Sequence, residues 1–168
     1  MDSRIPTRQG MALLADICHA ANGDKVTVPR RLTEADYDAV MRLWQHAGLT
    51  GVRPEGRDSR EAFARQLARG QVVLGLEELG KLIGCVVATH DTRKGWINRL
   101  AVHPDWRRQG IGQQLIAEAE ESLHQQGMSV IAAIIEPDNE ASLKLFIKAG
   151  YADWPGLHYV SKKSSKDA

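Results

Sequence analysis

The sequence predicts an α/β fold in which helices flank a mixed, mostly antiparallel sheet. Two short apolar runs, at 72–77 and 82–89, lie on either side of a Glu-Leu-Gly-Lys turn, as in an antiparallel hairpin. A third run at 95–102 follows the next turn. The second half of the chain then alternates an amphipathic helix, an apolar strand and another helix. Strands that first pair in hairpins and then alternate with helices build a mixed sheet.

One strand and two helices are expected ahead of the hairpin. Residues 26–32 are typical of a strand, and Pro29 favours a place at the sheet edge or a bulge, because proline cannot donate to a strand ladder. Thr33 begins a helix, since it opens a Thr-x-x-Asp relative of the capping box. A loop rich in Gly, Pro and Arg is expected over 50–58, and a short helix over 59–70.

The second half contains the clearest periodicity. Apolar residues recur at helical spacing over 110–126, so a long helix is expected there. The continuous apolar run 130–135 predicts a central strand buried on both faces. A helix over 139–150 follows, and its terminal glycine is typical of a C′ position. Residues 157–161 are expected to form a last strand.

Length and composition are those of a single soluble globular domain. The chain has 168 residues, of which 43% are hydrophobic and 26% charged, and its formal net charge is +1. This balance disfavours nucleic-acid binding, and no apolar run approaches the length of a membrane span. Cys18 and Cys85 form neither a disulfide framework nor a metal-ligand cluster, and Cys85 is expected in the core. We therefore expect a cytoplasmic protein without a bound metal.

A strand, a basic loop with two glycines and a helix start follow one another over 97–115. The apolar segment 97–102 runs into a Pro-Asp turn, and Arg107-Arg-Gln-Gly-Ile-Gly112 follows it. Glycines allow positive φ and close approach, and the first helical turn leaves N–H groups free for an anion. The arginines and the helix dipole add positive charge. The loop is therefore expected to bind a phosphorylated cofactor; the alternative is that its glycines serve only tight packing.

Two motifs resemble those of the GNAT acetyltransferases. The Arg107–Gly112 run is similar to the family's acyl-CoA loop, Arg/Gln-x-x-Gly-x-Gly/Ala. Residues 139–151 resemble a later motif, in which an Asn opens a helix that ends at Gly-Phe/Tyr. The resemblance covers roughly 26–162 and implies a GNAT fold, whose sheet splays between the fourth and fifth strands. Residues 1–25 would then be an N-terminal extension, either a short helix or poorly ordered, and 163–168 a polar tail.

The resemblance also implies which residues hold acetyl-CoA. Main-chain groups of Leu100 and Val102 would bind the pantetheine arm, and Asn139 and Phe146 would face it from the second motif. The residues that would wrap the pyrophosphate are Arg107, Arg108, Gln109, Gly110, Ile111, Gly112 and Gln113. The sequence-based alternative for Asn139 is a helix N-cap, and both roles can hold at once.

The sequence departs from the family pattern at the expected acid. Many members carry a tyrosine beside the thioester sulfur, and Phe146 occupies that place here. A phenyl ring cannot donate a proton, but a thiolate leaves readily because its conjugate acid is a thiol with a pKa of about 8.5. His158 and Tyr159 are possible substitutes, and the alternative is that they are ordinary strand residues.

The expected base is also missing. Family members that acetylate protein N-termini often have a glutamate five residues before the motif asparagine, and Ile134 stands there. The remaining candidates are His90 and Asp91 near a turn, and Asn98, which could hold a relay water. Each has an ordinary structural alternative, because these residue types are common beside hairpin turns.

The resemblance implies an acetyl-CoA-dependent N-acetyltransferase, in which an amine attacks the thioester directly. Neutralising a lysine-like amine costs roughly 4 to 5 kcal/mol at pH 7, against about 1 kcal/mol for an α-amine. A site without an evident strong base therefore favours amines of low pKa. We expect the acceptor to be a small-molecule amine or a peptide N-terminus, with a homodimer as a possible assembly. A catalytically degenerate domain that senses acyl-CoA is the alternative, favoured by Phe146 and Ile134.

Overall fold

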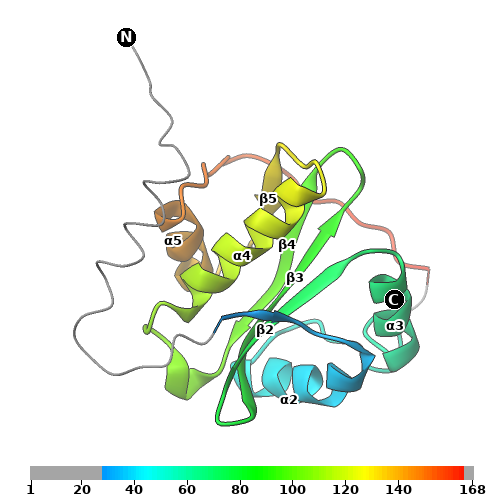
Figure 1. Ribbon diagram of the computed structural model, residues 1–168. Coiled ribbons are helices and arrows are strands. Elements are labelled where there is room, and N and C mark those ends of the chain that lie inside the picture. Colours follow the sequence, from blue (N-terminus) through cyan, green and yellow to red (C-terminus); the bar gives the residue numbers. More distant parts are fainter. Residues whose placement is uncertain (1–27, 165–168) are drawn as a thin grey trace.

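The computed structural model describes residues 28–164, and its centre is a five-stranded sheet in the order β1-β2-β3-β4-β5 (Figure 1). The first four strands pair antiparallel, and β5 pairs parallel to β4. The strands are β1 (Arg30–Arg31), β2 (Val72–Glu78), β3 (Lys81–His90), β4 (Gly95–Val102) and β5 (Ile131–Ala133). This topology confirms the predicted mixed, mostly antiparallel sheet.

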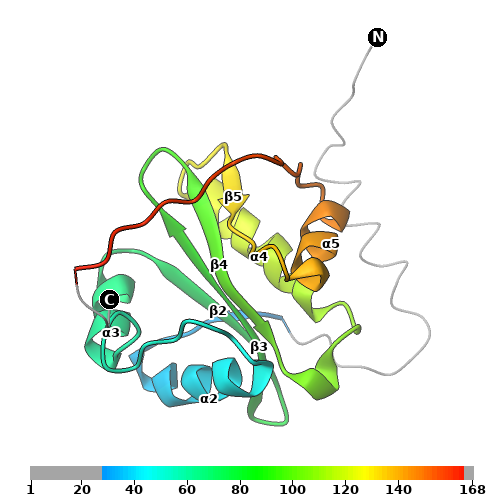
Figure 2. The same cartoon turned by 180° about the vertical axis from the view of Figure 1, so that it is seen from behind.

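Helices cover both faces of the sheet, which gives three layers (Figures 1 and 2). The helical elements are the 3-10 turn η1 (Glu34–Asp36), α2 (Tyr37–Ala47), α3 (Arg60–Ala68), the 3-10 turn η2 (Pro104–Trp106), α4 (Ile111–Gln125) and α5 (Glu140–Lys148). Within residues 28–164, none of these helices has both the length and the apolar character needed to cross a bilayer. The predicted helix positions are confirmed, with ends that differ by a few residues.

Strand alternation separates two hydrophobic cores. Val72 and Leu74 of β2 pack with α4, and Phe146 of α5 joins this core. Val73, from the same strand, packs on the other face with α2 and α3. Cys85 is fully buried in that second core, as expected, and burial raises the pKa of its thiol to about 12. Because side chains alternate between the two faces of a strand, neighbouring residues of β2 pack against helices on opposite faces of the sheet.

The sheet opens between β4 and β5. Their pairing is confined to the first part of β4, where Gly95, Trp96 and Ile97 lie opposite 131–133. Beyond Ile97, β4 continues to Val102 with no strand beside it on this edge among the described residues. A strand edge without a neighbour leaves backbone N–H and C=O groups available to an extended ligand. The splay implied by the family resemblance is therefore present.

Three strand predictions need correction. Residues 130–135 are not central, because β5 is last in the sheet order and Ile134 is 57% exposed. Residues 157–161 form no strand, and Leu157 and Val160 are exposed. An alternating segment becomes a strand only where an edge pairs with it. The sequence predicts the first strand over 26–32, but within the described residues it is confined to Arg30–Arg31 at the sheet edge. Residues 26 and 27 of that prediction lie outside the described residues, as does the predicted N-terminal extension.

Candidate functional site

The loop after β4 has the backbone geometry of an anion site. It passes through η2 and reaches α4 at Gly110, the N-cap, whose φ of +83° favours glycine. Arg108 also has positive φ, at +62°. The N–H of Gln114 donates to the carbonyl of Gly110 (3.0 Å), so the N–H groups of residues 111–113 precede the first i→i−4 bond of the helix. These donors and the positive end of the helix dipole lie at the end of the open β4 edge.

The two glycines of the loop have different roles. A Cβ at Gly110 would meet no heavy atom within 4 Å, so this glycine is required by its φ and not by space. A Cβ at Gly112 would lie 2.8 Å from Leu145 Cδ2 on α5, so a larger residue here would require the Leu145 side chain to shift. The two glycines are therefore constrained differently, Gly110 by its backbone conformation and Gly112 by a side chain of α5.

The arginines of the loop also differ. Arg107 donates to the carbonyl oxygens of Val102 (3.3 Å) and Ala47 (2.9 Å), which joins the end of β4 to the C-terminal end of α2. The Arg107 side chain therefore has a structural partner besides any ligand. Arg108 is exposed beside the helix start, where its charge can reach an anion. Gln109 Nε2 donates to the Asp105 carbonyl (3.3 Å) and closes the loop on η2.

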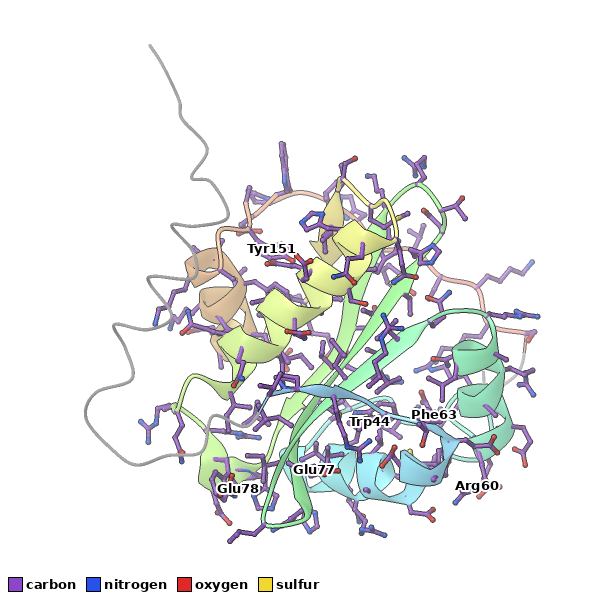
Figure 3. All side chains as sticks on the ribbon, in the orientation of Figure 1. Trp44, Arg60, Phe63, Glu77, Glu78 and Tyr151 are labelled. Atoms are coloured by element: carbon purple, nitrogen blue, oxygen red, sulfur yellow. The ribbon has the colours of Figure 1, made fainter. Side chains whose placement is uncertain are left out.

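The second motif forms α5, which lies beside α4. Asn139 is the N-cap, and its Oδ1 accepts from the N–H of Ser142 (3.1 Å). Phe146 is buried and packs edge-to-face on Tyr151, with ring centroids 5.0 Å apart. The Tyr151 hydroxyl, which Figure 3 places beside α4, is buried, and burial together with the nearby Glu120 carboxylate raises its pKa. Phe146 is thus a core residue, and whether it also contacts a cofactor stays a prediction.

The two candidate catalytic residues lie at different places along the sheet. Asn98 follows the last β4 residue paired with β5, and its Nδ2 donates to Thr89 Oγ1 (2.9 Å). His90 pairs with Gly95 at the closed end of β4, roughly 10 Å farther along at about 3.3 Å per residue. Only Asn98 therefore stands where the opening begins.

The His90 ring is held between its own turn and the C-terminal end of α4. Its Nδ1 accepts from the N–H of Thr92 (3.2 Å), and its Nε2 lies 3.1 Å from Gln126 Oε1. Asp91 has a lowered pKa because it accepts from the N–H groups of Lys94 and Arg93, which stabilise the carboxylate. His158 and Tyr159 lie in the exposed segment that forms no strand. The contacts of His90 and Asp91 favour their structural alternative, His158 and Tyr159 are not strand residues, and the acid and the base stay unassigned.

A network at the opening was missed from the sequence. Arg99 lies on β4 immediately after Asn98, and its Nη2 contacts both carboxylate oxygens of Asp58 (3.0 and 2.9 Å). Asp58 is the last residue of the 50–58 loop, which crosses the sheet face between α2 and α3 (Figure 2). At the start of that loop, Thr50 Oγ1 donates to Glu136 Oε2 (3.3 Å), just beyond β5. The one signal available in the sequence was an arginine inside the apolar run 97–102.

Comparison with known proteins assigns the family. The model of the acetyltransferase (GNAT) family matches residues 36–151. A curated acetyltransferase from Photorhabdus laumondii is 30% identical over 125 residues, which cover 74% of this chain and 85% of the relative. Two solved structures are similar in fold. AAC(6')-Iy in complex with the bisubstrate analogue CoA-S-monomethyl-acetylneamine superposes with a TM-score of 0.68 at 16% identity, covering 83% of this chain and 99% of that one. PaiA N-acetyltransferase from Thermoplasma acidophilum, in complex with coenzyme A, gives 0.63 at 20% identity, covering 74% and 88%. The open sheet, the glycine loop at the start of α4 and these matches together place the chain in the GNAT acetyltransferase family.

Proposed function

We propose that this protein transfers an acetyl group from acetyl-CoA to a primary amine of a small molecule or a peptide N-terminus. The observation that carries the proposal is that two sets of backbone hydrogen-bonding groups follow one another, those of the open β4 edge and those at the start of α4. Among the described residues, the edge of β4 that has no neighbouring strand leads from the opening at Asn98 to the N–H groups of residues 111–113, which precede the first helical hydrogen bond of α4. An extended chain that ends in a pyrophosphate fits both sets of groups at once.

Each part of acetyl-CoA has a place along this path. The pyrophosphate lies on the N–H groups of residues 111–113, with Arg108 supplying charge from the solvent side. The pantetheine arm runs along the main chain of Leu100 and Val102, and Asn139 faces it across the opening. The thioester then lies near Asn98, where β4 and β5 part.

The chemistry is direct attack by a neutral amine. The amine nitrogen bonds to the thioester carbonyl carbon, the C–S bond breaks, and the thiolate leaves as the amine proton passes to solvent or a relay water. Phe146 supplies no proton to the thiolate, which is a good enough leaving group to depart without one. Asn98 can hold a water at the opening through its side-chain amide. Positioning of an already neutral amine then supplies most of the rate enhancement.

The comparisons support a small-molecule acceptor and a CoA cofactor. AAC(6')-Iy binds an analogue in which CoA is joined to acetylneamine, and PaiA binds coenzyme A. Acetyl-CoA is available in the cytoplasm, which is where we place the reaction. The domain limits 26–162 and a homodimer stay predictions, which limited proteolysis and light scattering can check.

The deciding experiment measures thiol release from acetyl-CoA with a panel of primary amines, alongside calorimetry with CoA. We expect CoA to bind and at least one amine to accelerate thiol release above the rate in buffer. CoA binding without release for any amine would favour the acyl-CoA-sensing alternative, to which Phe146 and Ile134 give weight. No binding of CoA would overturn both functions.

A further inference from the structure

We infer that Arg99 and Asp58 are a positioning pair, which holds the 50–58 loop against β4 and so forms the acceptor side of the opening. The inference rests on the proposed function, since it concerns how the acceptor amine is held. It adds a specificity-determining element that lies outside the two sequence motifs.

The backbone of Arg99 has a conformation that is unusual for a strand residue. The register between β3 and β4 shifts between Cys85 and Val87, opposite the Arg99 region of β4. Arg99 itself has φ of +51°, which non-glycine residues rarely adopt within a strand. A bulge of this kind re-aims a side chain. Here it lies one residue past Asn98, where β4 loses its pairing with β5.

The re-aimed guanidinium is surrounded by the loop. Besides the two Asp58 contacts, Arg99 Nη1 donates to the carbonyl of Thr50 (3.3 Å) and Nη2 to that of Gly51 (3.4 Å). Its Cζ lies 5.2 Å from the ring centroid of Trp44, which Figure 3 shows on α2. The side chain is 20% exposed and that of Asp58 only 8%. One arginine thus reaches both ends of the loop.

Asp58 also makes hydrogen bonds with another residue of the loop and with α2. Its Oδ2 accepts from the N–H of Arg53 (2.8 Å), and its carbonyl accepts from the Tyr37 hydroxyl (2.8 Å). The Thr50–Glu136 hydrogen bond then joins the loop to the far side of the opening. The loop is therefore fixed at β4, at α2 and beyond β5. A partly buried charged pair with two short contacts and further hydrogen bonds to the loop is strongly orienting, and loss of either partner removes the contact that joins the end of the loop to β4.

The Arg99–Asp58 pair and the proposed pyrophosphate site lie on opposite faces of the sheet, so the effect of the pair on the acceptor can be separated from cofactor binding. Arg99 points to the sheet face covered by α2 and α3, as its contacts with Trp44 and Asp58 show. The N–H groups proposed to bind pyrophosphate belong to α4, which covers the opposite face. Loosening the loop should therefore weaken the hold on the acceptor and leave the affinity for CoA unchanged.

The test compares Arg99→Gln, Arg99→Lys and Asp58→Asn with a matched control, Arg30→Gln. Arg30 also pairs with a carboxylate, Asp36 at 2.7 Å, but at the β1 edge of the sheet. For the amine identified by thiol release, we expect Arg99→Gln and Asp58→Asn to raise the acceptor KM about tenfold or more with a smaller change in kcat. Arg99→Lys should give an intermediate KM, since one ammonium cannot replace all the guanidinium contacts. The Kd for CoA should stay within about twofold in all variants, and the control should match the parent.

Amide hydrogen exchange supplies a readout independent of activity. Exchange at 50–58 should accelerate in Arg99→Gln and Asp58→Asn but not in Arg30→Gln. Unchanged exchange and unchanged acceptor KM in either folded variant would overturn the inference, as would equal losses of CoA and acceptor affinity. If Arg99→Gln does not fold, the same measurements on Arg99→Lys and Asp58→Asn test the inference. An inactive parent would refute the proposed function, and with it the acceptor role, while accelerated exchange would still identify the pair as the anchor of the loop.

Discussion

Replacing Gly110 with aspartate is the sharpest test of the proposed pyrophosphate site. The substitution places a negative charge at the N-cap of α4, directly before the N–H groups of residues 111–113. An anionic side chain competes with a pyrophosphate for these donors and repels it. Loss of one hydrogen bond to a charged group costs about 1.5–3 kcal/mol, which is about a 10- to 150-fold loss of affinity.

The fold should survive this change. A Cβ at Gly110 meets nothing within 4 Å, so only the φ of +83° opposes a side chain. Asp and Asn tolerate this left-handed region better than other non-glycine residues. The net cost should be about 1 kcal/mol or less, which corresponds to a fall in Tm of about 2–4 °C.

Gly110→Asn is the matched control, because it has the same shape without the charge. Calorimetry with CoA should give a Kd for Gly110→Asp that is about tenfold or more above that for Gly110→Asn. The gap should narrow as salt is raised, since exposed charges are screened. Equal affinities in two folded variants would show that the pyrophosphate does not lie at this helix start.

Three further outcomes are expected. Phe146→Leu should lower the free energy of unfolding by about 1–3 kcal/mol through lost core packing and the edge-to-face contact with Tyr151. It should leave turnover in place, so loss of thiol release in the folded variant would give the ring a direct role. His90→Ala should leave the pH–rate profile unchanged for two acceptors of different amine pKa, because both ring nitrogens have protein partners, Thr92 in the turn and Gln126 at the end of α4. Disappearance of a rising limb would identify His90 as the base. Finally, a hydrogen bond from Arg30 lowers the pKa of Asp36 to about 2 from 3.8. The Asp36 carboxylate therefore stabilises the fold above its ordinary pKa, and this contribution is lost as the pH falls toward 2. Because Arg30 is 44% exposed, the parent should lose only about 1 kcal/mol more than Arg30→Gln on acidification from about pH 5 to 2, as measured by urea unfolding.

Local chemistry explains why much of the fold could be predicted. The β2–β3 hairpin follows from a short turn between apolar runs, and α4 from helical spacing that ends at Gly127, whose φ is +86°. Asn139 could be predicted as an N-cap for the same reason, since a cap needs only a side chain three residues before an N–H group. The positive φ at Gly110 also belongs to the loop itself.

Pairing and long-range contacts were decided by the tertiary structure. The apolar run 130–135 lies at the sheet edge because β5 borders the opening, and 157–161 forms no strand because no edge pairs with it. A period of two indicates a strand but does not identify its neighbour.

By itself, the sequence determined the order of the main elements, the glycine loop at a helix start and the resemblance to the GNAT family. Each depends on residues a few positions apart, which interact before any core forms. The Arg99–Asp58 pair joins residues 41 apart, and the contact of Gly112 with Leu145 joins α4 to α5. Such contacts depend on how the layers pack, so only the tertiary structure decided that the 50–58 loop lies against β4 at the opening.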